Sequence, residues 1–211
     1  MADIGIMGGT FDPIHNGHLL LGRQAYTEYG LDEIWFMPSG TPPHKRDHHV
    51  TEVEDRCEMV RLAIADTPGF RLSEFEAERC GNTYTSDTLR LLHQTYPQHR
   101  FFFIIGADSL YQIENWHHPA EVMEQTILLV ACREYPAADC PIEERIAYLE
   151  SHYQADIRRL HCEEFDVSSG ELRELLAKGK PVFKYVPKAV EQYIADHRLY
   201  TEPQTETEET N

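Results

Sequence analysis

The residues with the clearest chemical potential lie near the N-terminus, in the run 8–18, Gly-Gly-Thr-Phe-Asp-Pro-Ile-His-Asn-Gly-His. Two glycines after a short apolar strand let the backbone approach a phosphate closely. His15 and His18 are three residues apart at the start of a predicted helix, so both imidazoles can face one side. There they can donate hydrogen bonds to charge that develops on a phosphorus-bound oxygen. We therefore expect a phosphate-binding loop that feeds an anion-favouring helix N-terminus, with Asn16 as the helix cap.

Two better-known phosphate loops do not fit this run. The segment 5–10, Gly-Ile-Met-Gly-Gly-Thr, does not match the G-x-G-x-x-G of dinucleotide-binding proteins. No Gly-Lys-Ser/Thr follows the glycines, which excludes a Walker loop. An ordinary strand-to-helix turn is the alternative interpretation. His48 and His49 are adjacent and lack a second, well-spaced pair of ligands, so we predict no metal site built from protein side chains.

Short apolar runs alternate with segments of helical periodicity along the chain. Strands are expected at 3–7, 33–37, 70–72, 101–105 and 127–132. Helices are expected at 16–29, 51–66, 86–95, 141–152, 169–177 and 187–196, and Thr51 and Glu54 have the spacing of a capping box. This alternation predicts a single α/β domain, doubly wound around a mostly parallel Rossmann-like sheet with helices on both faces. The loops after Met7, Met37, Ile105 and Cys132 should then meet at one edge of the sheet, where such folds bind ligands.

Composition and charge narrow the function classes. The chain has 211 residues, of which 41% are hydrophobic, so it can bury a core and is not a disordered protein. Its formal net charge of −17 disfavours binding to nucleic acid, although a small anion can still bind where cations gather. No apolar run is long enough to span a membrane. Five cysteines without a framework and a start without a signal peptide predict a cytoplasmic protein. Residues 1–200 should form the domain, and 201–211 a solvated acidic tail.

Four further segments accompany the glycine–histidine run in order. They are Pro-Ser-Gly-Thr-Pro-Pro-His-Lys at 38–45, Thr-Tyr-Thr-Ser-Asp-Thr-Leu at 83–89, Gly-Ala-Asp at 106–108 followed by Trp116, and Val-Ser-Ser-Gly-Glu-Leu-Arg at 167–173. Together the five segments resemble the nucleotidyltransferase superfamily marked by His-x-Gly-His, and most closely the bacterial nicotinate-nucleotide adenylyltransferases. The resemblance extends from residue 3 to about residue 198. One departure is Gly170, where the family usually has threonine.

The resemblance implies transfer of AMP from ATP to nicotinate mononucleotide, with deamido-NAD and pyrophosphate as products. ATP should bring Mg²⁺ with it, held mainly by phosphates and water. The implied catalytic residues are His15, His18, Lys45 and Arg173. The implied ATP-binding residues are Gly8, Gly9, Thr10, Phe11, His15, His18, Gly106, Asp108, Ser168, Ser169 and Arg173. The implied substrate-binding residues are His44, Lys45, Tyr84, Thr85, Asp108, Trp116 and Arg133.

Other functions remain open from the sequence. A related enzyme could use a different acceptor or nucleotide, such as nicotinamide mononucleotide, phosphopantetheine or CTP. A module that binds nucleotide without catalysis would share the same loop. The preference for an acid over an amide depends on the exact placement of hydrogen-bond donors, which the sequence does not give. The oligomeric state is also open, and a homo-oligomer is compatible with the sequence.

Overall fold

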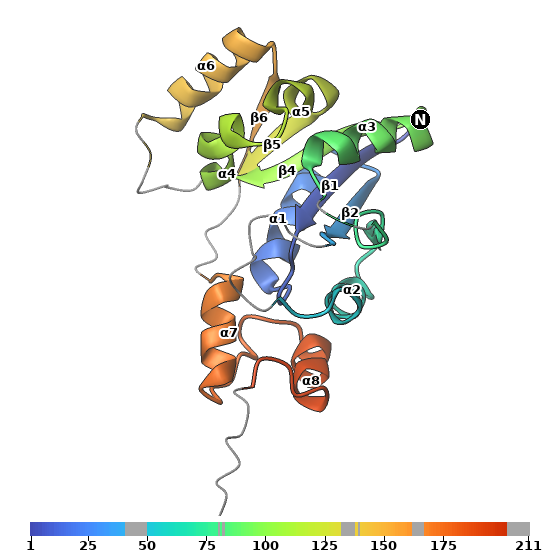
Figure 1. Ribbon diagram of the computed structural model, residues 1–211, viewed down its shortest axis with the longest axis vertical. Helices are drawn as coiled ribbons and strands as arrows, with labels where there is room; N and C mark the ends of the chain where they lie inside the picture. Colours follow the sequence, from blue (N-terminus) through green and yellow to red (C-terminus); the bar gives the residue numbers. More distant parts are fainter. Residues whose placement is uncertain are drawn as a thin grey trace, which may run out of the picture.

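The structure is a computed structural model that describes residues 1–40, 50–79, 81, 83–131, 138, 140–161 and 167–201. Its centre is a six-stranded sheet in which all strands are parallel, in the order β3-β2-β1-β4-β5-β6 (Figure 1). The strands are β1 (Asp3–Gly9), β2 (Glu33–Pro38), β3 (Phe70–Leu72), β4 (Arg100–Gly106), β5 (Ile127–Ala131) and β6 (Asp156–Leu160). The helices are α1 (Asn16–Glu28), α2 (Val53–Ile64), α3 (Thr85–Thr95), α4 (Ala107–Gln112), the 3₁₀ helix η1 (Ile113–Asn115), α5 (Pro119–Gln125), α6 (Ile142–Tyr153), α7 (Ser169–Ala177) and α8 (Lys188–Asp196).

Two apolar cores separate the helices into two layers. One core joins the sheet to α1, α2, α7 and α8, with Met59 and Val60 of α2, Leu172 of α7 and Ile194 of α8 among its members. The other core joins the opposite face to α3, α4, α5 and α6. Strand β4 is buried from Phe101 to Ile105, as expected of a parallel strand covered on both faces. The predicted doubly wound α/β fold is therefore confirmed.

Some local predictions were wrong. Helix α2 begins at Val53, with Glu52 rather than Thr51 in the capping position, so the expected capping box does not form. Asn16 is the first residue of α1 and not its cap, which is His15. The side-chain amide of Asn16 instead donates to the Lys184 carbonyl (3.2 Å) and ties α1 to the chain between α7 and α8.

Strand β6 and the short helices α4 and α5 were not predicted. Strand β6 has three charged residues, Asp156, Arg158 and Arg159, and two apolar residues. It tolerates these charges because it lies at the edge of the sheet, where one side of the strand has no neighbour. Helices α4 and α5 have six and seven residues, too few for a clear periodic pattern. Among the described residues, no helix is long and apolar enough to cross a membrane.

Candidate active site

The site is organised by the point at which the strand order reverses. From β1 the chain continues to β2 and β3 on one side of β1, and then returns to place β4, β5 and β6 on its other side. In open parallel sheets this switch point is where ligands bind, outside the carboxyl ends of the strands. Gly8 and Gly9 end β1, and Gly106 ends β4. Both predicted glycine segments therefore meet at one place, although Gly8 and Gly9 belong to the strand instead of following it.

The glycines of β1 allow aromatic rings to pack against the main chain. A Cβ on Gly9 would lie 3.3 Å from the Phe11 ring, and one on Gly8 would lie 3.4 Å from the Phe103 ring. Phe11 has a positive φ of 49°, and its side chain is buried. Its ring meets the edge of the His18 ring, with a centroid distance of 5.1 Å. Phe11 thus acts through packing, and only its main chain is available to a ligand.

His15 and His18 form one compact unit at the start of α1. Their ring centroids are 3.7 Å apart, with 33° between the ring planes. The His15 main-chain N–H donates to Nδ1 of His18 (3.2 Å). Because Nδ1 of His18 accepts this bond, the ring proton of a neutral His18 belongs on Nε2, where it can be donated to a ligand. The predicted juxtaposition of the two imidazoles is therefore present.

Both imidazoles are neutral at pH 7. Burial lowers the pKa of His15 to about 4. Burial and, to a smaller extent, the charge of His15 lower the pKa of His18 well below 6.5. A bound polyphosphate would favour the protonated forms and reverse these shifts.

The N-terminus of α7 docks on the same loop. Ser169 Oγ donates to the Pro13 carbonyl (3.0 Å), and Nη1 of Arg173 donates to the Asp12 carbonyl (2.7 Å). Residues 168–173 and the loop of β1 are far apart in sequence, and these bonds bring them together. The predicted phosphate-binding set of imidazoles, arginine and helix N-terminus is therefore assembled in one place.

Ser168 is engaged differently from what the sequence suggests. Its N–H and its hydroxyl both donate to Oε2 of Glu171 (2.7 Å each), and the Glu171 N–H donates back to Ser168 Oγ (3.2 Å). This capping box starts α7. The bonds from Ser168 lower the pKa of Glu171, so a carboxylate lies at a helix end expected to face phosphates. At Gly170 an added Cβ would make ordinary van der Waals contacts with Ser168 Oγ (3.8 Å) and Arg173 Nη2 (3.9 Å), so a Cβ fits at this position without a clash.

The residues expected at the pyridine end lie near the core formed with α3, α4, α5 and α6, against which Trp116 packs. Phe11 and Ile14, in the loop after β1, belong to the core on the opposite face of the sheet. Tyr84 precedes α3, Thr85 begins it, and the Tyr84 ring is 4.3 Å from that of His117. Trp116 follows η1 and packs edge-on against Phe103 (6.3 Å between centroids). Phe103 also faces Gly8, so one ring connects the phosphate loop with the tryptophan region.

Of the remaining predicted residues, the structure describes Asp108 but not His44, Lys45 or Arg133. Asp108 is in the first turn of α4, directly after Gly106 at the switch point.

Sequence reasoning missed three residues that hold the loop in place. Arg56 is 2% exposed and donates to the Thr10 carbonyl (2.8 Å). Asp12 is 3% exposed and accepts a bond from the Tyr200 hydroxyl at Oδ1 (2.7 Å). Asp12 is part of the run 8–18 but was given no role there, and Arg56 was not singled out within the predicted helix 51–66.

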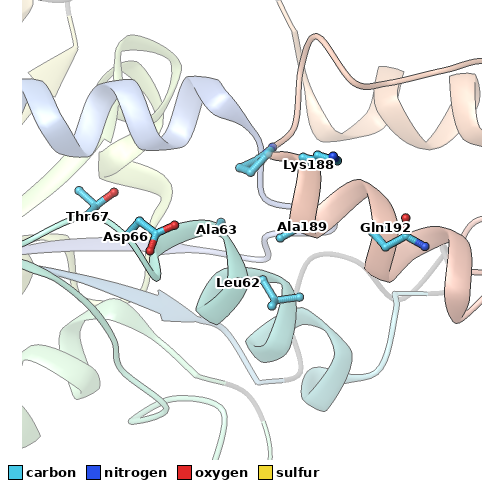
Figure 2. A pocket seen from close by; sticks show the side chains of 8 residues that line it. Leu62, Ala63, Asp66, Thr67, Lys188, Ala189 and Gln192 are labelled. Atoms are coloured by element: carbon cyan, nitrogen blue, oxygen red, sulfur yellow. The ribbon is translucent and has the colours of Figure 1, made fainter.

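A cavity of about 540 Å³ lies elsewhere, between the end of α2 and the start of α8 (Figure 2). Its walls include Leu62 and Asp66 on one side and Lys188 and Gln192 on the other. None of the predicted site residues that the structure describes lines it. A ligand site is more strongly indicated at the switch point, where donors from three elements converge, than in this cavity, to which the described lining residues contribute the Lys188 ammonium group.

Comparison with known proteins identifies the family of the chain. A family model described as cytidylyltransferase-like matches residues 6–185. A probable nicotinate-nucleotide adenylyltransferase of Lachnoclostridium phytofermentans is 43% identical over 200 residues, covering 95% of this chain and 100% of the relative. The nicotinate-nucleotide adenylyltransferase of Bacillus subtilis is 39% identical over 200 residues, covering 95% of this chain and 99% of the relative.

A solved structure supports the fold. The Plasmodium falciparum nicotinic acid mononucleotide adenylyltransferase complexed with NaAD has a TM-score of 0.78 and 22% identity, covering 95% of this chain and 98% of that chain. At this identity the likeness concerns the fold alone, whereas the curated relatives and the family model concern the family. The family predicted from the sequence is confirmed: the chain belongs to the nicotinate-nucleotide adenylyltransferases, within the cytidylyltransferase-like family.

Proposed function

We propose that the protein transfers AMP from ATP to nicotinate mononucleotide and releases pyrophosphate. The observation that carries this assignment is the close pair of imidazoles, His15 and His18, at the switch point of the sheet. Arg173 donates to the loop that ends at this pair, so three hydrogen-bonding side chains meet beside two helix N-termini. Such a set of donors is suited to a polyphosphate.

The chemistry is an in-line displacement at the α-phosphorus. A phosphate oxygen of the mononucleotide forms the new P–O bond, and the bond between the α-phosphorus and the bridging oxygen breaks, so pyrophosphate takes the electron pair. Phosphoryl transfer of this kind depends on positioning and charge stabilisation more than on a protein nucleophile. In this proposal His15 and His18 donate to the α- and β-phosphates, and Arg173 binds the β,γ-phosphates. The first turn of α7, with Ser168 and Ser169, adds helix-end amides and hydroxyls.

The remaining roles are extensions of this proposal. Lys45 stabilises charge that develops during transfer, and His44 and Arg133 bind the phosphate of the acceptor. Tyr84, Thr85 and Trp116 bind the pyridine ring and its carboxylate, since an indole stacks well on a flat aromatic ring. Asp108 accepts from ribose hydroxyls, and Gly8, Gly9, Thr10, Phe11 and Gly106 present main chain to ATP.

The donor set is compatible with Mg²⁺ carried by ATP. Among the described residues, no group of three or more histidine, cysteine, aspartate or glutamate side chains could hold a metal ion. The site instead offers N–H groups, which bind phosphate oxygens and leave the ion to phosphates and water, as Mg²⁺ prefers. The ion would neutralise part of the charge on the leaving pyrophosphate.

A pyrophosphate-release assay with a panel of acceptors tests the function. With ATP, we expect turnover with nicotinate mononucleotide at least ~10-fold faster than with the amide, because recognition of a carboxylate discriminates strongly against a group that cannot pair with its donors. Faster turnover with phosphopantetheine, or with CTP as the nucleotide, would assign a different member of the superfamily. ATP binding without pyrophosphate from any acceptor would indicate a sensing module.

Three further properties complete the proposal. Residues 1–200 form the catalytic domain, and 201–211 act as a solvated tail. The protein works in the cytoplasm, as the sequence predicts. It acts on small molecules and not on nucleic acid, and it can assemble as a homo-oligomer.

A further inference from the structure

Arg56 is an unusual residue because it is a fully buried cation. It is 2% exposed on α2, between the apolar core and the loops at the carboxyl ends of β1 and β2. Burying a charge without hydrogen bonds is very unfavourable, so a buried guanidinium must be satisfied by its surroundings. Burial lowers the pKa of Arg56, whereas the nearby Asp12 carboxylate raises it.

The guanidinium is satisfied by carbonyl groups from three separate segments. Nη1 donates to the carbonyls of Thr10 and Ser39 (2.8 Å each), and Nη2 donates to that of Gly40 (3.0 Å). Nε donates to the Thr51 carbonyl just before α2 (2.9 Å). Four bonds from one planar group thus connect the loop after β1, the loop after β2 and the start of α2.

These bonds fix the orientation of peptide groups at the switch point. In a trans peptide the C=O and the following N–H point in opposite directions. Turning the Thr10 carbonyl toward Arg56 therefore turns the Phe11 N–H away from it, and the Ser39 carbonyl does the same for the Gly40 N–H. The main-chain donors of both loops are consequently held outward from the buried side chain.

We propose that Arg56 is a positioning residue that sets the loops after β1 and β2 for transfer, acting through the peptide groups it binds. The inference rests on the proposed function. A guanidinium is suited to this role because its planar fork reaches several acceptors in fixed directions. A lysine would carry the same charge but donate all its bonds from one nitrogen, so it cannot hold the three segments in the same way.

The test compares Arg56→Lys and Arg56→Ala with Arg61→Lys and Arg61→Ala. Arg61 is a matched control because it is on the same helix, is about half exposed and pairs with Glu58 and Glu74. Pyrophosphate release is measured below the melting temperature of every variant, so that only folded protein is assayed. Activity of the wild type and of the Arg61 variants tests the proposed function separately.

We expect Arg56→Lys to lower kcat by about 100-fold while each KM changes by less than about threefold, because small misplacements affect the reacting geometry more than binding. Ethylguanidinium should partly restore kcat to Arg56→Ala, and ethylammonium should not. Should Arg56→Ala fail to fold, Arg56→Lys decides alone. A folded Arg56→Lys with reduced melting temperature but wild-type kcat would overturn the proposal and leave Arg56 a stabilising residue only.

Discussion

At the scale of single residues, the proposed chemistry depends on two imidazoles that are held by backbone and by an aromatic ring. His18 accepts from the His15 N–H and is packed by Phe11, so its Nε2–H is fixed before substrate arrives. Preorganised donors of this kind stabilise developing charge without reorganisation.

Replacing His18 by alanine should remove one such donor. We expect His18→Ala to lower kcat by about 10²–10³ while the fold, measured by circular dichroism, stays unchanged. His152→Ala is the control, since His152 is exposed on α6. Near-normal pyrophosphate release from folded His18→Ala would contradict the assigned role.

The low pKa of His15 predicts a pH-dependent stability. The folded state resists protonation of this ring until pH about 4, whereas the unfolded chain binds a proton near pH 6.5. Stability from this group is therefore complete above pH 6.5 and is lost as the pH falls toward 4. Between pH 7.5 and pH 5 the loss amounts to about 2 kcal/mol.

Denaturant unfolding of wild type and His15→Asn at both pH values measures this effect. The free energy of unfolding should fall less in the variant than in the wild type. Equal losses in the two proteins would show that His15 does not titrate as described.

The sequence predicted which residues of the candidate site would lie together at this scale, because loop chemistry is local. Gly8, Gly9, His15 and His18 lie together in the chain, and the structure brings Arg173 to them as expected. Arg56 and Asp12 could not be assigned in the same way. Their roles depend on carbonyl and hydroxyl partners from distant segments, and these partners become neighbours only after folding.

At the scale of elements, α7 contains a conflict between helix capping and anion binding. Glu171 stabilises the helix start by accepting from Ser168, but its negative charge opposes a polyphosphate at the same end. Glutamine can replace the carboxylate in a capping box without the charge.

Glu171→Gln should therefore bind ATP more tightly. We expect the KM for ATP to fall by about two- to fivefold with kcat unchanged, the size of one exposed charge near a helix end. The effect should shrink at an ionic strength of about 0.5 M. Glu174→Gln, further along α7, is the control and should change neither value. A higher KM in Glu171→Gln would mean that the carboxylate serves ATP binding.

The elements themselves were predicted where burial imposes a pattern. The central strands β1, β4 and β5 were located because both of their faces are covered, which requires continuous apolar runs. Strand β6 carries charges at the sheet edge and was missed. The start of α2 was predicted at Thr51 because Thr51 and Glu54 have the spacing of a capping box. In the structure the helix begins at Val53, and the Thr51 carbonyl, which lies before it, accepts a hydrogen bond from Arg56.

At the scale of the whole molecule, the C-terminal segment supports the N-terminal loop. The Tyr200 hydroxyl donates to Asp12 and is hydrogen-bonded by the Thr51 side chain. Burial is the main cause of the raised pKa of Tyr200, so this hydroxyl stays protonated. Figure 1 shows α7 and α8 at one end of the molecule beside α1 and α2, where these contacts form.

Removing this hydroxyl should destabilise the protein. We expect Tyr200→Phe to lower the free energy of unfolding by about 2 kcal/mol, because a buried carboxylate loses a hydrogen-bond donor. Tyr148→Phe, at a ring that is 44% exposed, should cost less than about 0.5 kcal/mol. A chain ending at Thr201 should match the wild type, since residues 202–211 are expected to be solvated. A large loss in that shortened chain, or none in Tyr200→Phe, would refute this interpretation.

The support of loop 10–15 by Ser169, Arg173 and Tyr200 has a consequence for biosynthesis. The histidines leave the ribosome early, but the residues that support their loop follow more than 150 positions later in the chain. A nascent chain that has not yet reached Tyr200 can form the first strands and helices yet cannot complete the proposed catalytic centre. Enzyme activity should thus arise only after Tyr200 has left the ribosome.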